Sequence, residues 1–337
     1  MAIGVDIGTA FLCSARRKED NTVKLAKIRD AFFTVELTAF VKQMLESMKV
    51  NYIEKDGELF VIGDEAVDLA SSFNKEARRP MSQGMLSPKE KEALPIIRLI
   101  IEKLVGTPKK DNEILYFSVP ANPIDSFQDV NYHGGMVKAI MENIGYSVSY
   151  MNEALAVIYS ELLDKKFTGI GISFGAGMVN CCFANLSIPV FNFSIAKSGD
   201  WIDKMVAQSQ GIVASKVTGI KENDLDLKKD QNNIILKSLK IYYETLIDYV
   251  LKLCIEQFKK VEDLPNLGEG ICIAVAGGTS MPPGFIDLFK ERLQKSKFPV
   301  KIAEVRHSKR ALYAVATGCL IAAESQEKKE EKISKAE

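Results

Sequence analysis

The sequence predicts an α/β protein made of two related halves that face each other across a cleft. Short apolar runs of strand length alternate with longer segments of helical pattern, and the run at 114–119 ends at Pro120, as a buried parallel strand would. A strand, a turn of small residues and a second apolar strand occupy 2–13, and the same arrangement returns at 169–184. Such an internal repeat indicates a duplicated domain with a cleft between the copies.

The first half is predicted to begin with two strands around Gly8 and to continue with a more mixed pattern. Asp56-Gly57 is typical of a hairpin turn, and Gly106 and Pro108 end the helix that precedes them. The expected elements are strands at 2–5 and 11–13, a helix at 37–48, a hairpin at 51–62, a helix from about 89 or 93 to 105, a strand at 114–119, a helix at 135–143, a strand at 146–150 and a helix at 153–164.

The second half is predicted to repeat the strand arrangement and to end in a helix. The expected strands are 169–174, 178–184, 189–195, 271–276 and 300–303, and the expected helices are 200–210, 212–221, 232–259, 283–295 and 309–323. We expect a first domain at 1–165 with a small inserted subdomain at about 32–94, and a second at 166–323 with one at about 212–264. The mixed-charge stretch 324–337 is expected to be a disordered, solvated tail.

Composition excludes several classes of function. The 337 residues include 44 basic and 44 acidic side chains, so no net charge would attract a polyanion and direct nucleic-acid binding is not expected. Six cysteines without a CxxC pattern and two distant histidines predict neither a disulfide framework nor a zinc site, which favours a reducing compartment. No apolar stretch approaches about 18 residues, so we expect no membrane insertion and a cytoplasmic location.

Three turns of small residues at strand ends carry the candidate chemistry. Asp6 precedes Gly8-Thr9-Ala10, a turn whose backbone N–H groups could meet phosphate oxygens while the carboxylate holds the water shell of a magnesium ion. An ordinary hairpin turn with a capping aspartate is the alternative. The other two turns are Gly175-Ala176-Gly177 and Gly277-Gly278-Thr279-Ser280. Neither GxxxxGK[ST] nor a GxGxxG opening a helix is present, which disfavours P-loop and dinucleotide folds.

With these turns identified, the sequence resembles the actin, heat-shock-chaperone ATPase and sugar-kinase superfamily. Its first phosphate motif, first connecting helix, second phosphate motif, adenosine motif and second connecting helix are matched in order by 5–10, 151–156, 172–180, 274–284 and 311–321. Two shorter segments, 198–203 and 220–222, are also similar to the family. The resemblance covers nearly the whole chain and implies a duplicated actin-like ATPase fold, with two domains around a nucleotide cleft.

The resemblance also implies a role for each matching residue, with ATP or ADP and Mg²⁺ as cofactors. Asp6 would hold the magnesium water shell, and Glu153 would orient the attacking water or a magnesium-bound water. The nucleotide would be surrounded by Gly8, Thr9 and Ala10, by Gly175, Ala176 and Gly177, by Lys221 and Glu222, and by Gly277, Gly278, Thr279 and Met281. The plainer alternatives are a dipole-favoured acid at a helix start for Glu153, a solvated helix face for Lys221-Glu222 and a simple helix entry for Gly277-Gly278.

One position departs from the family pattern. The second phosphate motif normally begins with an aspartate, and this chain has Ser173 there, with Met178 and Asn180 at later polar positions. A serine can hydrogen-bond a magnesium-bound water but adds no negative charge to activate it. We therefore expect nucleotide binding with slow ATP hydrolysis.

Within the superfamily, the chain resembles prokaryotic actin-like proteins of the MreB or plasmid-segregating type. A chaperone would be expected to carry a peptide-binding domain after the ATPase, and we identify no sugar-binding aspartate of a sugar kinase. The resemblance implies head-to-tail self-association into cytoskeletal filaments. An adaptor protein, which the sequence does not identify, is compatible with this expectation. The alternative is a monomeric ATP-responsive switch, either chaperone-like or regulatory.

Overall fold

A computed structural model describes residues 2–334, apart from positions 74, 128, 266 and 269. The chain forms two large mixed sheets with the same topology, each belonging to one half. The first sheet has the order β3-β2-β1-β9-β10, and the second has the order β13-β12-β11-β14-β15. In each, the first three strands are antiparallel and the last three are parallel. The predicted duplicated fold is confirmed.

The strands of the two sheets correspond one to one. Those of the first sheet are β1 Ile3–Ile7, β2 Phe11–Arg17, β3 Val23–Arg29, β9 Ile114–Val119 and β10 Ser147–Asn152. Those of the second are β11 Gly169–Phe174, β12 Val179–Asn185, β13 Ile188–Ile195, β14 Ile271–Ala276 and β15 Ile302–His307. Asp6 pairs with Cys13 in the first hairpin, and Ser173 pairs with Asn180 in the second, so Asp6 and Ser173 hold equivalent positions.

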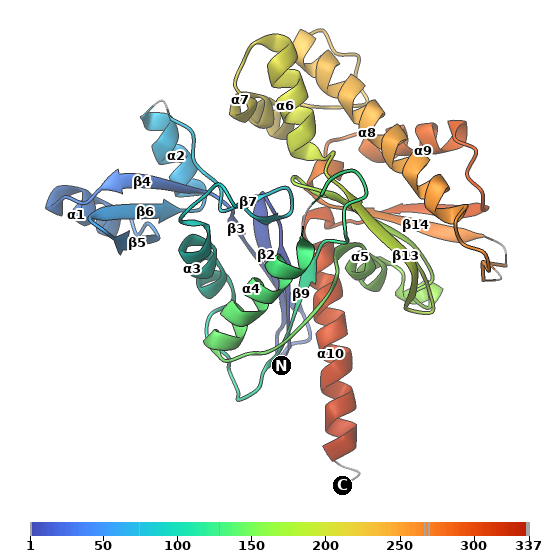
Figure 1. Cartoon of the computed structure of the whole chain (residues 1–337), viewed down its shortest axis with the longest axis horizontal. Coiled ribbons are helices and arrows are strands. Elements are labelled where there is room, and N and C mark those ends of the chain that lie inside the picture. Colours follow the sequence, from blue (N-terminus) through green and yellow to red (C-terminus); the bar gives the residue numbers. More distant parts are fainter. Residues whose placement is uncertain (1, 74, 128, 266, 269, 335–337) are drawn as a thin grey trace.

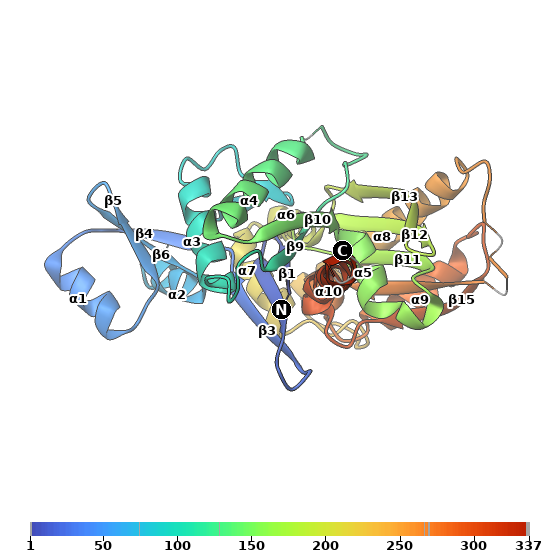
Figure 2. The same cartoon turned by 90° about the horizontal axis from the view of Figure 1, so that it is seen from below.

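Two helices lie between the sheets, α5 Glu153–Glu161 and α10 Ala314–Ser334 (Figures 1 and 2). They pack against each other, and α10 also packs on β1 and β9 while α5 packs on β11. The approach is close because α10 carries Gly318, where a Cβ atom would lie 1.9 Å from the carbonyl oxygen of Ala156. Only glycine permits this contact, which joins the two halves below the cleft.

A smaller sheet extends the first half, on the left of Figure 1. It has the order β4-β6-β5, and a two-stranded hairpin follows it. The elements are β4 Phe32–Glu36, α1 Ala39–Ser47, β5 Tyr52–Lys55, β6 Glu58–Ile62, α2 Asp64–Ser72, β7 Met81–Ser82 and β8 Met85–Leu86. The predicted turn between β5 and β6 is confirmed, since Asp56 and Gly57 both have positive φ, as a tight hairpin turn requires.

The remaining helices cover the outer faces of the sheets and extend the second half. They are α3 Ala93–Val105, α4 Val130–Ile144, α6 Gly199–Gln210, α7 Ala214–Asn223, α8 Ile234–Phe258 and α9 Phe285–Lys295. Helices α6, α7 and α8 pack together and rise above the second sheet, facing α2 across the upper gap in Figure 1. Short 3₁₀ turns lie at Leu163–Lys165, Gly278–Ser280 and Ala311–Tyr313.

Two sequence expectations need correction. The sequence pattern predicts no strand at 23–29, yet β3 forms there as an edge strand. Its exposed lysines, Lys24 and Lys27, lie three residues apart and therefore break the period-two alternation. The stretch 324–334, expected to be disordered, continues α10. Its side chains reach the first half, because Glu324 pairs with Arg17 at 2.7 Å and Gln326 accepts a hydrogen bond from Tyr116. These contacts with the first half stabilise the charged C-terminal turns of α10.

Candidate functional site: a cavity between the halves

A cavity of about 690 Å³ lies between the two halves and collects the residues predicted from the sequence. Every one of them lines it: Asp6, Gly8, Thr9, Ala10, Glu153, Ser173, Gly175, Ala176, Gly177, Lys221, Glu222, Gly277, Gly278, Thr279 and Met281. These positions lie as far apart as 275 residues in the chain. Because the topology repeats, the turn after β1 and the turn after β11 both line this space.

Asp6 sits near the carboxyl end of β1 and is fixed by the neighbouring strand. The Ser118 hydroxyl, on β9, donates to Asp6 Oδ1 at 2.8 Å and accepts the backbone N–H of Ile7 at 3.3 Å. Burial raises the pKa of Asp6 to about 6, and the Ser118 hydrogen bond opposes that rise. The side chain is therefore an oriented carboxylate whose charge a cation in the cavity would stabilise.

Glu153 is the first residue of α5, and its helix start is well capped. The Asn152 side-chain oxygen accepts from the backbone N–H groups of Ala154 and Leu155 at 3.0 and 3.2 Å, which fixes the helix start beside the cavity. Burial, followed by the nearby charge of Asp6, raises the pKa of Glu153 to about 8. A negative charge on Asp6 therefore makes ionisation of Glu153 less favourable.

The carboxylate of Glu153 is held at both oxygens by the second hairpin. Ser173 Oγ donates to Oε1 at 2.6 Å, and Asn180 Nδ2 donates to Oε2 at 2.8 Å. Asn180 is buried, and its own Oδ1 accepts the backbone N–H of Ala121, from the first half, at 2.9 Å. In the sequence, Asn180 stands out only as a departure from the family pattern, because its partner Glu153 lies 27 residues away in the chain.

The turns after β1 and β11 almost touch. A Cβ atom on Gly177 would lie 2.1 Å from Thr9 Oγ1 and 2.5 Å from the backbone nitrogen of Gly84, so a larger residue would force the turns apart. Gly84 N–H, at the turn between β7 and β8, donates to Thr9 Oγ1 at 2.8 Å. The small residues in these turns therefore allow three backbone segments to meet at one end of the cavity.

The third turn is tied to the second. Thr279 Oγ1 donates to the carbonyl oxygen of Gly175 at 2.8 Å, and Ser198 Oγ donates to that of Ala176. Thr279 and Ser198 are themselves buried. The glycine turns thus form one hydrogen-bonded unit in the second half.

Lys221 and Glu222 lie at the α7 side of the cavity. The Lys221 ammonium is buried and donates to Asp203 Oδ2 at 2.7 Å, while Thr218 Oγ1 donates to the same oxygen at 2.7 Å. Glu222 is exposed in part and lies 3.5 Å from Arg29. A solvated helix face therefore does not describe Lys221.

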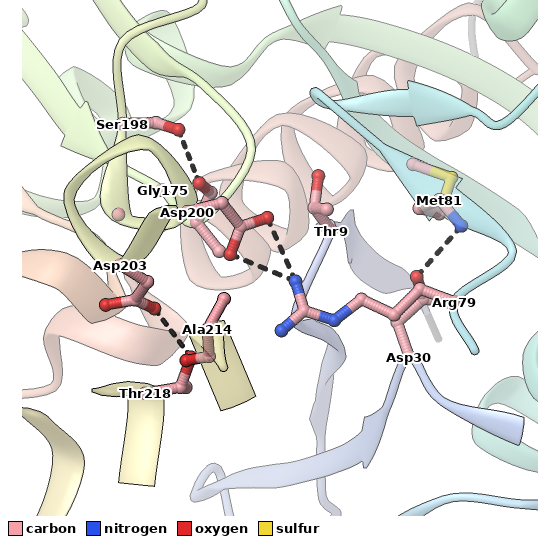
Figure 3. Close-up of polar contacts among 12 residues, drawn as sticks. Thr9, Asp30, Arg79, Met81, Gly175, Ser198, Asp200, Asp203, Ala214 and Thr218 are labelled. Atoms are coloured by element: carbon pink, nitrogen blue, oxygen red, sulfur yellow. Dashed lines mark hydrogen bonds and ion pairs between the residues drawn. The ribbon is translucent and has the colours of Figure 1, made fainter. Parts of the chain in front are cut away.

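Several lining residues were not singled out as site residues by the sequence analysis. Arg79, Asp200, Asp203, Thr218 and Tyr243 all border the cavity. Figure 3 shows Arg79 extending toward Asp200, with Thr9 beside it. A signal for two of them was available, since Asp200 and Asp203 fall in the segment 198–203 that resembles the family.

The comparison with protein families decides the assignment, because the model of the Volactin family matches residues 1–323. The chain belongs to the Volactin family. No curated protein matches the chain significantly. Among solved structures, this Volactin chain is similar to a MamK double helical filament, with 18% identity and a TM-score of 0.72, over 96% of this chain and 98% of that one.

Two further solved structures share the fold of this Volactin chain. MreB 5 of Spiroplasma citri bound to AMPPNP has 15% identity and a TM-score of 0.70, over 98% of both chains. Ethanolamine utilization protein EutJ from Carboxydothermus hydrogenoformans has 15% identity and a TM-score of 0.57, over 95% of this chain and 89% of that one. These likenesses confirm the expected actin-like fold of two domains.

Membrane insertion was not expected, and no helix in the described part of the Volactin chain has the length and apolarity to span a bilayer. The six cysteines are all unpaired and buried. Among the residues that the structure describes, no group of three or more histidines, cysteines and carboxylates could hold a metal ion. A cation here would depend on one or two carboxylates together with water and ligand oxygens, as Mg²⁺ commonly does.

Proposed function

We propose that this chain binds Mg-ATP or Mg-ADP in the cavity between its halves and uses that binding to control self-association. The observation that carries the proposal is the convergence of two equivalent glycine turns, each at the end of a buried strand, on one cavity. A volume of about 690 Å³ suits a nucleotide. Similar folds hold such ligands, since one MamK mutant is bound to AMPPNP and MreB5 is bound to ADP.

Magnesium fits the carboxylates at this end of the cavity. Asp6 and Glu153 lie close enough for the charge of one to raise the pKa of the other. A divalent cation would remove that penalty, with Asp6 holding its water shell. When bound, Mg-ATP supplies the phosphoanhydride bond and the charge that polarises its terminal phosphate. The proposed domains, 1–165 and 166–323, would each contribute one phosphate-facing turn.

We propose slow hydrolysis, with Glu153 orienting the attacking water. Its two oxygens accept hydrogen bonds from Ser173 and Asn180, so the carboxylate is fixed in place but has fewer lone pairs left for a water. Ser173 adds no negative charge where the family has an aspartate. These two features together favour a stable bound nucleotide over rapid turnover.

Head-to-tail assembly into filaments is the process that we propose the bound nucleotide controls. Its support is the shared fold of the MamK double helical filament, together with a cavity whose walls come from both halves. A nucleotide that contacts both halves would fix the shape of the protomer, and repeated copies of one shape can stack. A monomeric ATP-responsive switch is the alternative, and an adaptor protein is compatible with either.

Calorimetric titration with Mg-ATP tests the binding proposal. Wild type should bind at micromolar concentration, and Asp6→Ala should bind more weakly because the cation loses its carboxylate. Asp20→Ala is a matched control, since Asp20 is exposed and contacts Thr22 in the turn after β2. Absence of binding by wild type would overturn the central proposal.

Sedimentation and light scattering test assembly separately. Scattering should rise on addition of Mg-ATP above a critical protein concentration, and Asp6→Ala should abolish the rise. Electron microscopy of the same sample identifies filaments directly. A protein that binds Mg-ATP yet sediments as a monomer, also with a slowly hydrolysed analogue, would favour the switch.

A further inference from the structure

Arg79 reaches from the first half to the second across the mouth of the cavity. It lies just before β7, and its Nη1 donates to both carboxylate oxygens of Asp200, at the start of α6, at 3.0 and 2.9 Å (Figure 3). About a third of each side chain is exposed, 31% for Arg79 and 37% for Asp200. We call this ion pair the clasp.

Charges on the two walls of the mouth are complementary. The first half contributes Lys27, Arg29 and Arg79. The second contributes five acids, Asp200, Asp203, Glu222, Asp224 and Asp226, and two lysines, Lys221 and Lys229, which pair with Asp203 and Asp226. Two further contacts join the same halves, Arg29 to Glu222 at 3.5 Å and the Ser215 hydroxyl to Glu76. Attraction between the walls therefore favours closure even without a ligand.

A second carboxylate for Arg79 lies within its own half. Asp30 is completely buried at the end of β3; its Oδ2 accepts the backbone N–H of Met81 at 3.1 Å, and its Oδ1 has no hydrogen-bond partner in the described part of the chain. Burial raises the pKa of Asp30, and the charge of Arg79 opposes that rise. Figure 3 shows the Arg79 guanidinium at Asp200 and, in this view, Asp30 near the base of the Arg79 side chain. An unpaired buried acceptor is costly, so Asp30 would gain if Arg79 turned toward it.

The clasp is also connected to the phosphate end of the cavity. Arg79 leads into the β7–β8 hairpin, whose Gly84 N–H holds Thr9 Oγ1. Only four residues separate Arg79 from Gly84, so the position of Arg79 bears on the geometry of the first glycine turn.

We propose that Arg79 is a positioning residue that moves between two carboxylates: Asp200 holds it when the cleft is closed, and Asp30 holds it when the cleft is open. Loss of the clasp then opens the cleft and speeds release of the nucleotide. The effect on nucleotide release rests on the proposed function. The movement of Arg79 and the opening of the cleft do not depend on a nucleotide.

Spin labels measure the opening without any nucleotide. Cysteines introduced at Asp68 on α2 and Lys216 on α7 place one label on each half; both positions are exposed, and the six native cysteines are buried. In pulsed dipolar spectroscopy the wild type should give a short, narrow distance distribution. Asp200→Asn, which keeps the size of the side chain, should add a population at longer distance.

Companion variants distinguish the clasp from a general loss of charge or fold. Arg78→Met is the matched control, because Arg78 contacts Thr34, Glu90 and the Phe32 ring within the first half, and it should leave the distances unchanged. Arg79→Met should open the cleft as Asp200→Asn does, and the double variant should open it no further. Arg79→Lys should restore closure in part, since it keeps the charge but not the fork. Should Arg79→Met fail to fold, Asp200→Asn still decides.

Asp30→Asn tests the open state, because it keeps an acceptor for Met81 N–H and removes the charge. It should reduce the open population in the Asp200→Asn background. An unchanged open population in that double variant would overturn the role of Asp30. Distances that stay as in wild type for Asp200→Asn would overturn the clasp itself.

The rate at which the protein releases a fluorescent ATP analogue provides a second test of the clasp. Asp200→Asn should release it about tenfold faster than wild type and Arg78→Met should not, a coupling within the usual range between sites. Faster release without any change in distance would overturn the clasp as the cause. If wild type binds no nucleotide but Asp200→Asn opens the cleft, the clasp stands and the proposed function fails.

Discussion

Ser173 donates a hydrogen bond to Glu153 at 2.6 Å, from the sheet of one half to the helix that connects the halves. In the equivalent position of the first hairpin stands Asp6, whose pKa is raised to about 6 by burial. One hairpin thus presents a carboxylate to the cavity, and the other presents a hydroxyl that is already bonded to a third residue. This asymmetry is the basis of the first two predictions.

Glu153→Gln should lower steady-state phosphate release from Mg-ATP by about 10²-fold, because an amide orients the attacking water less effectively and accepts no proton. Nucleotide affinity should change little. Glu142→Gln on α4 is the control, since Glu142 is exposed and pairs only with Lys138 among the ion pairs that the structure gives it. Phosphate release at the wild-type rate would remove Glu153 from the mechanism.

Ser173→Asp would place a third carboxylate beside Asp6 and Glu153. In the presence of a chelator its thermal unfolding midpoint should fall below that of Ser173→Asn, which has a similar size and no charge. Adding Mg²⁺ should raise the midpoint of Ser173→Asp more than that of the wild type, because the cation neutralises the added charge. Equal responses of the two variants to Mg²⁺ would argue against a cation at this position.

The elevated pKa of Glu153 predicts a pH dependence of stability. The folded protein retains this proton up to about pH 8, whereas the unfolded chain releases it near the ordinary value of 4.5. The stabilising contribution is therefore complete below that ordinary value and is lost as pH rises toward 8. Between pH 5 and 8 without Mg²⁺, the calorimetric midpoint of Glu153→Gln should fall less than that of wild type. Parallel curves would contradict the raised pKa.

Gly177→Ala tests the close meeting of the two turns. The added Cβ would overlap Thr9 Oγ1 and Gly84 N, so the variant should lose about 1–3 kcal/mol of stability and bind Mg-ATP more weakly. Gly135→Ala on α4 is the matched control, because a Cβ there meets no atom within 4 Å and alanine favours a helix. Chemical denaturation of both variants gives the comparison. A stable, fully binding Gly177→Ala protein would show that the turns need not meet.

The sequence by itself determined the duplicated α/β fold, the order of most elements and a set of residues that all reach one cavity. These features can be predicted because a strand that ends in a glycine turn is a local pattern. The hairpin that contains Asp6 is also repeated by the hairpin that contains Ser173. It did not reveal β3, because Lys24 and Lys27 interrupt the alternation of that strand. Nor did it reveal the continuation of α10, which depends on partners such as Arg17.

Only the tertiary structure decided which side chains meet across the halves. Arg79 and Asp200 are 121 residues apart, and Asn180 joins Glu153 to Ala121 over separations of 27 and 59 residues. No local period or motif encodes such a pairing, because an ion pair or a hydrogen bond depends on distance in space and not on spacing along the chain. The glycine turns of the cavity are local patterns, so the sequence identified them. The ion pair between Arg79 and Asp200 is not local, so only the folded chain shows it.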